Sequence, residues 1–138
     1  MQTENDVIKA VCNYLVANNY SITQQLMTVQ TGVDIVATSQ NGIKCFVEAK
    51  GETSSKPSSS KYGKEFDKSQ VKTHVGVALV AAFKVKNEFP SSESIIALPD
   101  SLNHVALVEA MRTPIISSGI QVLFVSDSGS IRKLDPEL

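Results

Sequence analysis

The sequence predicts an α/β domain in which helices flank both faces of a mixed β-sheet. The chain has 138 residues, 42% of them hydrophobic and 20% charged. That is enough for one buried core and too little for two ordinary domains, so we expect residues 1–138 to form a single domain. The second observation is the order of patterns along the chain. In the first half of the chain an apparent hairpin predicts antiparallel strands. Strand–helix–strand crossovers, which join parallel strands, follow it in the second half.

The first two elements are a helix and a strand. Residues 3–19 have a helical pattern in which Thr3 can cap the start and Glu4 suits the positive end of the helix dipole. Its apolar face is made by Val7, Val11, Tyr14 and Leu15. Residues 20–30 alternate polar and β-branched side chains, which predicts a strand.

A hairpin is predicted next, because two apolar runs, 33–39 and 43–50, flank the turn signal Gln40-Asn41-Gly42. A two-residue turn would put Asp34 and Glu48 on opposite faces. A three-residue turn with Gly42 in the left-handed conformation would instead place Asp34 directly opposite Glu48.

The second half of the chain alternates helices and strands. Residues 51–66 are rich in serine, glycine and lysine and predict a mobile loop. Asp67 can cap a helix over 67–86, which we expect to be largely buried because its later turns are apolar nearly all round. A strand over 93–99 precedes a helix over 102–119, capped by Asp100 or Ser101, kinked near Pro114 and ended by Gly119. Residues 120–134 predict a final strand pair around the turn at 127–129.

The hairpin raises an electrostatic question, because Lys50 shares the face on which the three-residue turn places Asp34 and Glu48. Like charges directly opposite each other destabilise a strand pair. A divalent cation bound between them would reverse that effect, and Mg²⁺ prefers oxygen ligands.

The spacing of Asp34, thirteen further residues and then Glu48-Ala49-Lys50 resembles the motif of the PD-(D/E)XK nuclease superfamily, the restriction-endonuclease-like fold. The resemblance implies a core of order α-β-β-β-α-β, here followed by an α-β-β extension. It also implies that Asp34, Glu48 and the Ala49 carbonyl hold Mg²⁺ or Mn²⁺. Lys50 would activate the attacking water or stabilise charge on the phosphate.

The same resemblance implies further site residues. Gln70, near the start of the helix after the motif, would supply a positioning hydrogen bond. His74 lies one turn later, where many relatives have tyrosine, and its role is left open. Relatives often add a glutamate from the first helix to the metal site; Glu4 is the available one and lies very early. The Pro-Asp dipeptide of the family name is absent, because Val33 precedes Asp34.

A basic segment accompanies the motif. Residues 44–72 contain seven lysines and four acidic residues, a net charge of 7 − 4 = +3 in a chain of net charge −1. Such a lip beside the site would meet phosphates, although a solvated lysine-rich loop is the simpler interpretation without the motif. The candidate nucleic-acid contacts are Lys56, Lys61, Lys64, Lys68 and Lys72.

Other features narrow the class of protein. Cys12 and Cys45 do not have the spacing of a disulfide framework or a zinc-binding motif. We expect both to be small, buried apolar residues. The polar N-terminus shows no signal peptide, and no apolar run is long enough to span a membrane, so a cytoplasmic protein is expected. His104 has no partner motif and is interpreted as structural.

Three functions follow. The first is a metal-dependent endonuclease acting on DNA, with RNA left open as substrate; a homodimer would cover more DNA than one small domain. The second is a nucleic-acid-binding or assembly module that kept the fold without catalysis. The third is an interaction protein in which the motif is a coincidence, which side chains of Asp34 and Glu48 on opposite faces would support.

Overall fold

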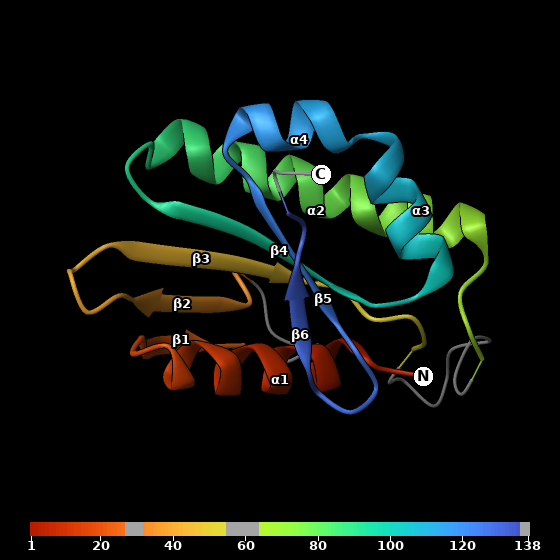
Figure 1. The fold of residues 1–138 in the computed structure, drawn as a ribbon, viewed down its shortest axis with the longest axis horizontal. Coiled ribbons are helices and arrows are strands. Elements are labelled where there is room, and N and C mark those ends of the chain that lie inside the picture. Colours follow the sequence, from red (N-terminus) through yellow and green to blue (C-terminus); the bar gives the residue numbers. More distant parts are fainter. Residues whose placement is uncertain (27–31, 55–63, 136–138) are drawn as a thin grey trace.

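The computed structural model of the chain describes residues 1–26, 32–54 and 64–135. Within them a single six-stranded sheet has its strands in chain order, from β1 to β6 (Figure 1). β3–β4 and β4–β5 are parallel and the other pairs antiparallel, so the predicted mixed sheet is confirmed. The elements are α1 (Glu4–Ala17), β1 (Ser21–Gln25), β2 (Ile35–Thr38), β3 (Lys44–Ala49), α2 (Lys68–Glu88), β4 (Glu93–Pro99), α3 (Leu102–Ala110), α4 (Arg112–Ser118), β5 (Gln121–Val125) and β6 (Ile131–Lys133).

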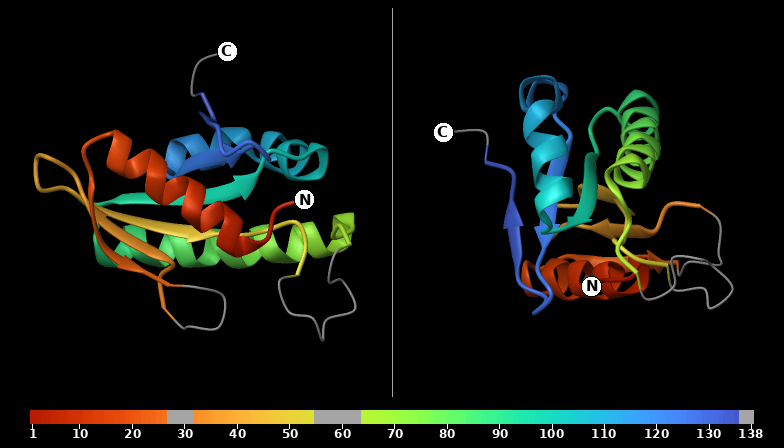
Figure 2. Two further views of the ribbon diagram at one scale, coloured as in Figure 1. Left: turned by 90° about the horizontal axis from the view of Figure 1, so that it is seen from below. Right: turned by 90° about the vertical axis from the view of Figure 1, so that its right-hand side faces the viewer.

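The sheet separates two apolar cores, as the prediction of helices on both faces requires. On one face α1 packs with Val7, Val11 and Leu15 against the inward residues of β2 and β3. On the other face α2, α3 and α4 lie side by side (Figure 2), and buried residues of α2 and α3 meet those of β4 and β5. Alternate residues of the central strands therefore serve opposite cores.

The third predicted helix is interrupted earlier than expected. Met111, with φ −117° and ψ 13°, separates α3 from α4, whereas the kink was predicted near Pro114. Pro114 is the third residue of α4, and the N–H groups of the first helical turn have no intrahelical partner, so its missing N–H costs no hydrogen bond there. The predicted ends are confirmed: Ser101 caps α3, and Gly119 ends α4 at φ 81°.

α2 is less buried than predicted. Val71, Val75, Ala78 and Ala82 face the sheet and are buried, but the outward-facing valines and Phe83 are about half exposed. Apolar composition all round a helix therefore does not imply burial all round it. The sheet covers one side of α2 and α3 lies beside it, while no other described helix or strand covers the outer side (Figure 2).

The segment after β3 is tied down where it is described. Gly51, Glu52 and Thr53 are buried, which corrects the prediction of a mobile loop for these residues. The rest of that prediction falls mostly on residues 55–63, including Lys56 and Lys61, which lie outside the described residues.

Candidate functional site

The β2–β3 turn has the three-residue form. The N–H of Ser39 donates to the carbonyl of Ile43 at 2.8 Å, and the N–H of Gly42 donates to the carbonyl of Ser39 at 3.0 Å. Gly42 has φ 85°, a left-handed conformation that glycine adopts without strain. The ladder pairs Ile35 with Val47, which confirms the predicted register.

Continued by one residue, that register places Asp34 opposite Glu48. Ile35 and Val47 are buried in the α1 core, so alternation directs Asp34, Glu48 and Lys50 to the other face of the sheet. All three are half-buried. One oxygen of Asp34, Oδ2, accepts a hydrogen bond from the N–H of Ala49 at 2.8 Å, which ties this carboxylate to the end of β3.

These residues lie at one edge of the sheet. The carboxyl ends of the parallel strands β3, β4 and β5 meet there, and α1, α2 and α3 begin beside the same edge (Figure 1). In open α/β sheets the crevice outside the carboxyl ends of the strands is the usual place for a ligand. Helix N-termini also favour anions. The edge is therefore suited to a phosphate-containing ligand.

The electrostatics show that three carboxylates share this edge. Burial, followed by the charge of Asp34, raises the pKa of Glu48 to about 7. Burial and then Asp34 also raise the pKa of Glu4. Burial raises the pKa of Asp34, although the Ala49 N–H and Lys50 oppose the shift. Lys50 lowers the pKa of each carboxylate in turn, so it lies within electrostatic reach of all three.

The donor set limits how a cation can be held. Among the described residues, no three side chains of His, Cys, Asp or Glu come close enough together to hold a metal ion. Glu4 thus interacts with the pair through space but does not complete a three-carboxylate group with Asp34 and Glu48. Mg²⁺ needs only one or two carboxylates, because it keeps several of its waters.

Two predicted contributors come from α2. Gln70 forms a capping box with Asp67: its side-chain Oε1 accepts from the Asp67 N–H at 3.0 Å, and its own N–H donates to Asp67 Oδ1 at 2.9 Å. The side-chain oxygen of Gln70, Oε1, is therefore already bonded at the start of α2. The side-chain NH₂ group is the part of Gln70 that can contact a substrate. The His74 ring packs edge-on against Phe66, with ring centres 4.6 Å apart. Burial and then Lys50 lower the pKa of His74.

The structure describes three of the five lysines that the sequence offers as nucleic-acid contacts. Lys64, Lys68 and Lys72 are exposed at and before the start of α2, beside the carboxylate edge. Their three positive charges therefore lie on the face of the sheet that α2 covers.

A backbone clamp that no sequence pattern indicated fixes α1 to the end of β3. The Gln2 N–H donates to Glu52 Oε1 at 2.9 Å, and the Glu52 N–H donates to the Gln2 carbonyl at 2.8 Å. Gly51 lies against this junction so closely that a Cβ there would be 2.5 Å from the Glu4 nitrogen. The clamp sets where Glu4 stands relative to Lys50.

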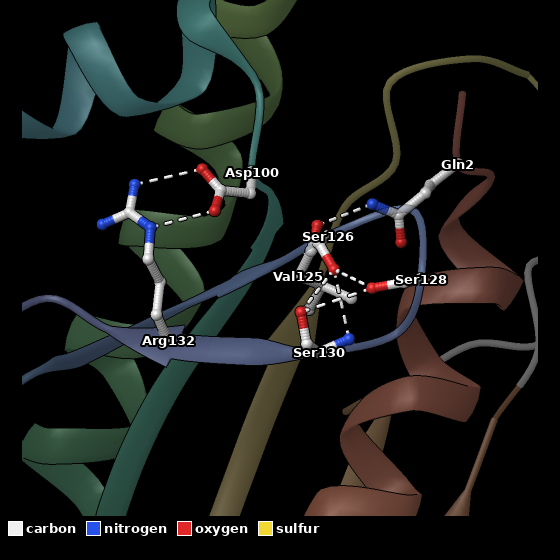
Figure 3. A network of polar contacts seen from close by, with 7 residues as sticks. All are labelled: Gln2, Asp100, Val125, Ser126, Ser128, Ser130 and Arg132. Atoms are coloured by element: carbon white, nitrogen blue, oxygen red, sulfur yellow. Dashed lines mark hydrogen bonds and ion pairs between the residues drawn. The ribbon is translucent and has the colours of Figure 1, made fainter.

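Further polar contacts lie at the same edge of the sheet, around the turn between β5 and β6 (Figure 3). Gln2 Nε2 donates to the Val125 carbonyl at 2.6 Å. Beyond it the hydroxyls of Ser126, Ser128 and Ser130 bond to one another. Arg132 makes a two-point ion pair with Asp100, at 2.9 and 3.0 Å.

His104 has the structural place predicted for it. It is 1% exposed, and its Nδ1 lies 2.6 Å from the Ser101 hydroxyl. Its Nε2 has no hydrogen-bond partner among the described residues. Burial lowers the pKa of His104 to about 4, so the ring is neutral at pH 7.

We expect Glu48→Gln to stabilise the metal-free protein at high pH. The unfolded carboxyl has a pKa near 4.5 and the folded one about 7, so the folded chain binds the proton more tightly between these values. Wild-type stability therefore falls as pH rises from about 4.5 to about 7. Glutamine removes that loss, so the variant should gain about 2 kcal/mol by about pH 8, after allowance for partial exposure.

Urea unfolding in EDTA measures this gain in stability. Glu88→Gln, at the exposed end of α2, is the control, and an equal gain in both variants would contradict the assignment.

Comparison with known proteins gives fold relatives only. No family model matches the chain, and no curated protein matches it. None of the helices in the described parts of the chain is long and apolar enough to cross a membrane. A solved XisH family protein from Nostoc punctiforme PCC 73102 is 18% identical, with a TM-score of 0.57, and the match covers 97% of this chain and all of that one. An fdxN element excision controlling factor protein from Anabaena variabilis is 19% identical, with a TM-score of 0.53, over 96% and 98% of the two chains. At such identities the two structures show that this chain shares their fold over nearly its whole length.

Proposed function

We propose that the protein is a metal-dependent phosphodiesterase that cleaves DNA. The observation that carries the proposal is the hairpin register, which sets two half-buried carboxylates opposite each other with Lys50 on the same face. A buried anionic pair of this kind is costly unless a cation offsets it. The raised pKa of Glu48, about 7, expresses that cost.

A DNA substrate is supported by two further observations. Exposed lysines at the start of α2 adjoin the carboxylate edge, and cations that follow a site in this way suit a phosphate backbone. The fold neighbour from Anabaena variabilis is named as an fdxN element excision controlling factor, and that name suggests a DNA-related role. RNA has the same phosphodiester chemistry and remains an arm of the test.

The residues fit Mg²⁺ or Mn²⁺. Asp34 and Glu48 would hold the ion, joined by the Ala49 carbonyl. In an extended strand the N–H and C=O of one residue point to the same side, and the Ala49 N–H points at Asp34. When bound, the ion would neutralise charge on the phosphate and lower the pKa of a bound water. Glu4, which the sequence resemblance offered as a further ligand, would add negative charge near the ion without binding it directly.

The protein groups would divide the remaining work. Lys50 would stabilise the developing negative charge or assist the attacking water. The Gln70 amide NH₂ would position a substrate oxygen, while its carbonyl stays bonded to the helix cap. Lys64, Lys68 and Lys72 would hold the backbone on either side of the scissile phosphate, with Lys56 and Lys61 assigned the same role from sequence alone.

The alternative is a module that binds nucleic acid without cutting it. It is favoured by the name of the Anabaena variabilis neighbour, which states control of excision and not cleavage. It makes the same lysines responsible for affinity and gives the carboxylates no chemical role.

The proposal is tested by incubating the protein with duplex, branched and single-stranded DNA, and with RNA, in Mg²⁺ and in EDTA. We expect cleavage of DNA only with the metal. Asp34→Asn should abolish it while leaving binding in Ca²⁺ within a few fold, because the amide keeps the size of the side chain but loses its charge. Binding without cleavage by the wild type in any metal would favour the alternative. Crystals soaked in Mn²⁺ should show density between Asp34 and Glu48.

A further inference from the structure

The outer face of α2 carries a regular stripe that no described helix or strand covers. Residues 69, 73, 76, 80, 83 and 87 recur at spacings of 4, 3, 4, 3 and 4, the repeat by which one helix packs along another. In order they are Ser69, Thr73, Gly76, Val80, Phe83 and Asn87. Val80 is 56% exposed and Phe83 is 49% exposed, and neighbouring Val77 is 52% exposed. The solvent side of a surface helix normally carries charge, and this stripe carries none.

Gly76 gives the stripe a concave surface in addition to its apolar character. Glycine inside a helix is unfavourable relative to alanine. A Cβ built at Gly76 would meet no atom within 4 Å, so none of its described neighbours requires glycine there. Because Gly76 has no side chain, a shallow hollow opens on this face. The hollow is lined by Ser69, Lys72, Thr73, Gly76, Val77 and Val80. Phe83 projects from the same face one turn beyond.

We propose that this face of α2 binds the same face of a second copy, with the two helices antiparallel. The two-fold axis would pass between the helices at the height of Ala78, whose own side chain faces the sheet. The stripe is symmetric about that position: each pair 69 with 87, 73 with 83, and 76 with 80 is equally spaced from it. A two-fold interface must be self-complementary. Here the ring of the partner's Phe83 falls at the level of Thr73 and enters the hollow beside Gly76.

The charges near the stripe agree with this occupant. By helical geometry, Lys72 lies on the same side of the stripe as the partner's Phe83, so in the dimer its ammonium can rest on that ring in a cation–π contact. The exposed Lys64 and Lys68 would then remain for the DNA contact proposed above. Nucleic acid is disfavoured as the occupant, because phosphates need cations and the stripe between Lys72 and Lys84 has none.

The size of the face predicts a reversible dimer. From Ser69 to Asn87 the helix runs about 27 Å, and two such faces bury on the order of 1,000 Å² in total, at the small end of specific interfaces. The dimer should therefore dissociate on dilution. Because the carboxylate edge adjoins the N-terminal end of α2, the two sites would lie at opposite ends of the helix pair, about 30 Å apart. This inference does not depend on the proposed nuclease activity.

Sedimentation equilibrium without nucleic acid tests the proposal. We expect wild type to pass from monomer to dimer over roughly the micromolar range typical of small interfaces. Val80→Glu should weaken association at least tenfold, and Gly76→Leu, which fills the hollow, should do the same without loss of helix content in circular dichroism. Val16→Glu, on the exposed side of α1 where Val16 is 58% exposed, is the matched control and should change nothing.

Cysteine cross-linking tests the register. A mixture of Ser69→Cys and Asn87→Cys chains should form a disulfide-linked dimer between unlike chains under mild oxidation. Ser69→Cys alone should not, since its two copies would lie about 27 Å apart. A wild type that stays monomeric at every concentration, or a dimer unaffected by Val80→Glu and Gly76→Leu, would overturn the proposal. Self-linking of Ser69→Cys would show a parallel pair and overturn the antiparallel register. Loss of DNA binding in Val80→Glu with no dimer in the wild type would assign the face to nucleic acid instead.

Discussion

Lys50→Ala is expected to reduce metal-dependent DNA cleavage about 1000-fold while leaving DNA binding in Ca²⁺ nearly unchanged. Lys50 follows the carboxylate pair on the same face and lowers the pKa of Glu4, Asp34 and Glu48, so its charge acts on the reacting region. A cation aimed at developing phosphate charge commonly contributes several kcal/mol to the transition state. Metal binding should persist, because Asp34, Glu48 and the Ala49 carbonyl remain. Single-turnover cleavage and Ca²⁺ binding titrations separate the two effects.

Lys68→Ala is the matched control for this variant. Lys68 is an exposed cation at the start of α2, so its loss should weaken DNA affinity and its salt dependence without slowing the chemical step at saturating protein. If wild type cleaves DNA and Lys50→Ala cleaves it equally fast, the role assigned to Lys50 is wrong. A loss of affinity in Ca²⁺ as large as the loss of rate would make Lys50 a binding residue only.

Gly51→Ala is expected to destabilise the fold by about 3 kcal/mol, a large effect for a single added methyl group. That methyl would lie 2.5 Å from the Glu4 nitrogen, 2.7 Å from the Thr3 carbonyl carbon and 2.9 Å from the Gln2 oxygen. These are backbone atoms held by the clamp hydrogen bonds, so the neighbours cannot rotate away. Urea unfolding measures the loss.

Gly76→Ala is the control, since it makes the same chemical change in open space on a helix. At concentrations where the chain is monomeric it should raise stability by about 1 kcal/mol, because alanine favours the helix. Equal effects of the two substitutions would show that the contact at Gly51 yields without cost. Where Gly51→Ala still folds, cleavage should fall further than stability explains, since α1 and Glu4 would shift away from Lys50.

The part of the site that could be predicted is the part set by local chemistry. The left-handed Gly42 and the alternation of apolar residues determine the hairpin register, and both are visible over a few residues of chain. The caps Thr3, Asp67 and Ser101 are likewise local, because each side chain accepts a hydrogen bond from an N–H three residues on. The order of strands follows from short connections and parallel crossovers.

The rest depends on contacts between distant parts of the chain. The clamp joins Gln2 to Glu52, and Gln2 also reaches Val125, so no periodicity or motif signals it. Sequence composition overestimates the burial of α2 for a related reason. Composition shows that a side chain is apolar but not what covers it, and covering is a property of the assembled layers.

The Gln40-Asn41-Gly42 turn has a consequence for how such chains can vary in length. Surface loops usually tolerate insertions and deletions, and a turn at the exposed end of a hairpin would be expected to tolerate them too. Here one residue more or fewer would shift the pairing of β2 against β3 and turn one strand over, because side chains alternate with a period of two. Either Asp34 and Glu48 would part, or Ile35 and Ala37 would leave the core. Chains of this fold that keep the carboxylate pair should therefore keep this turn at constant length, while connections elsewhere on the surface lengthen and shorten freely.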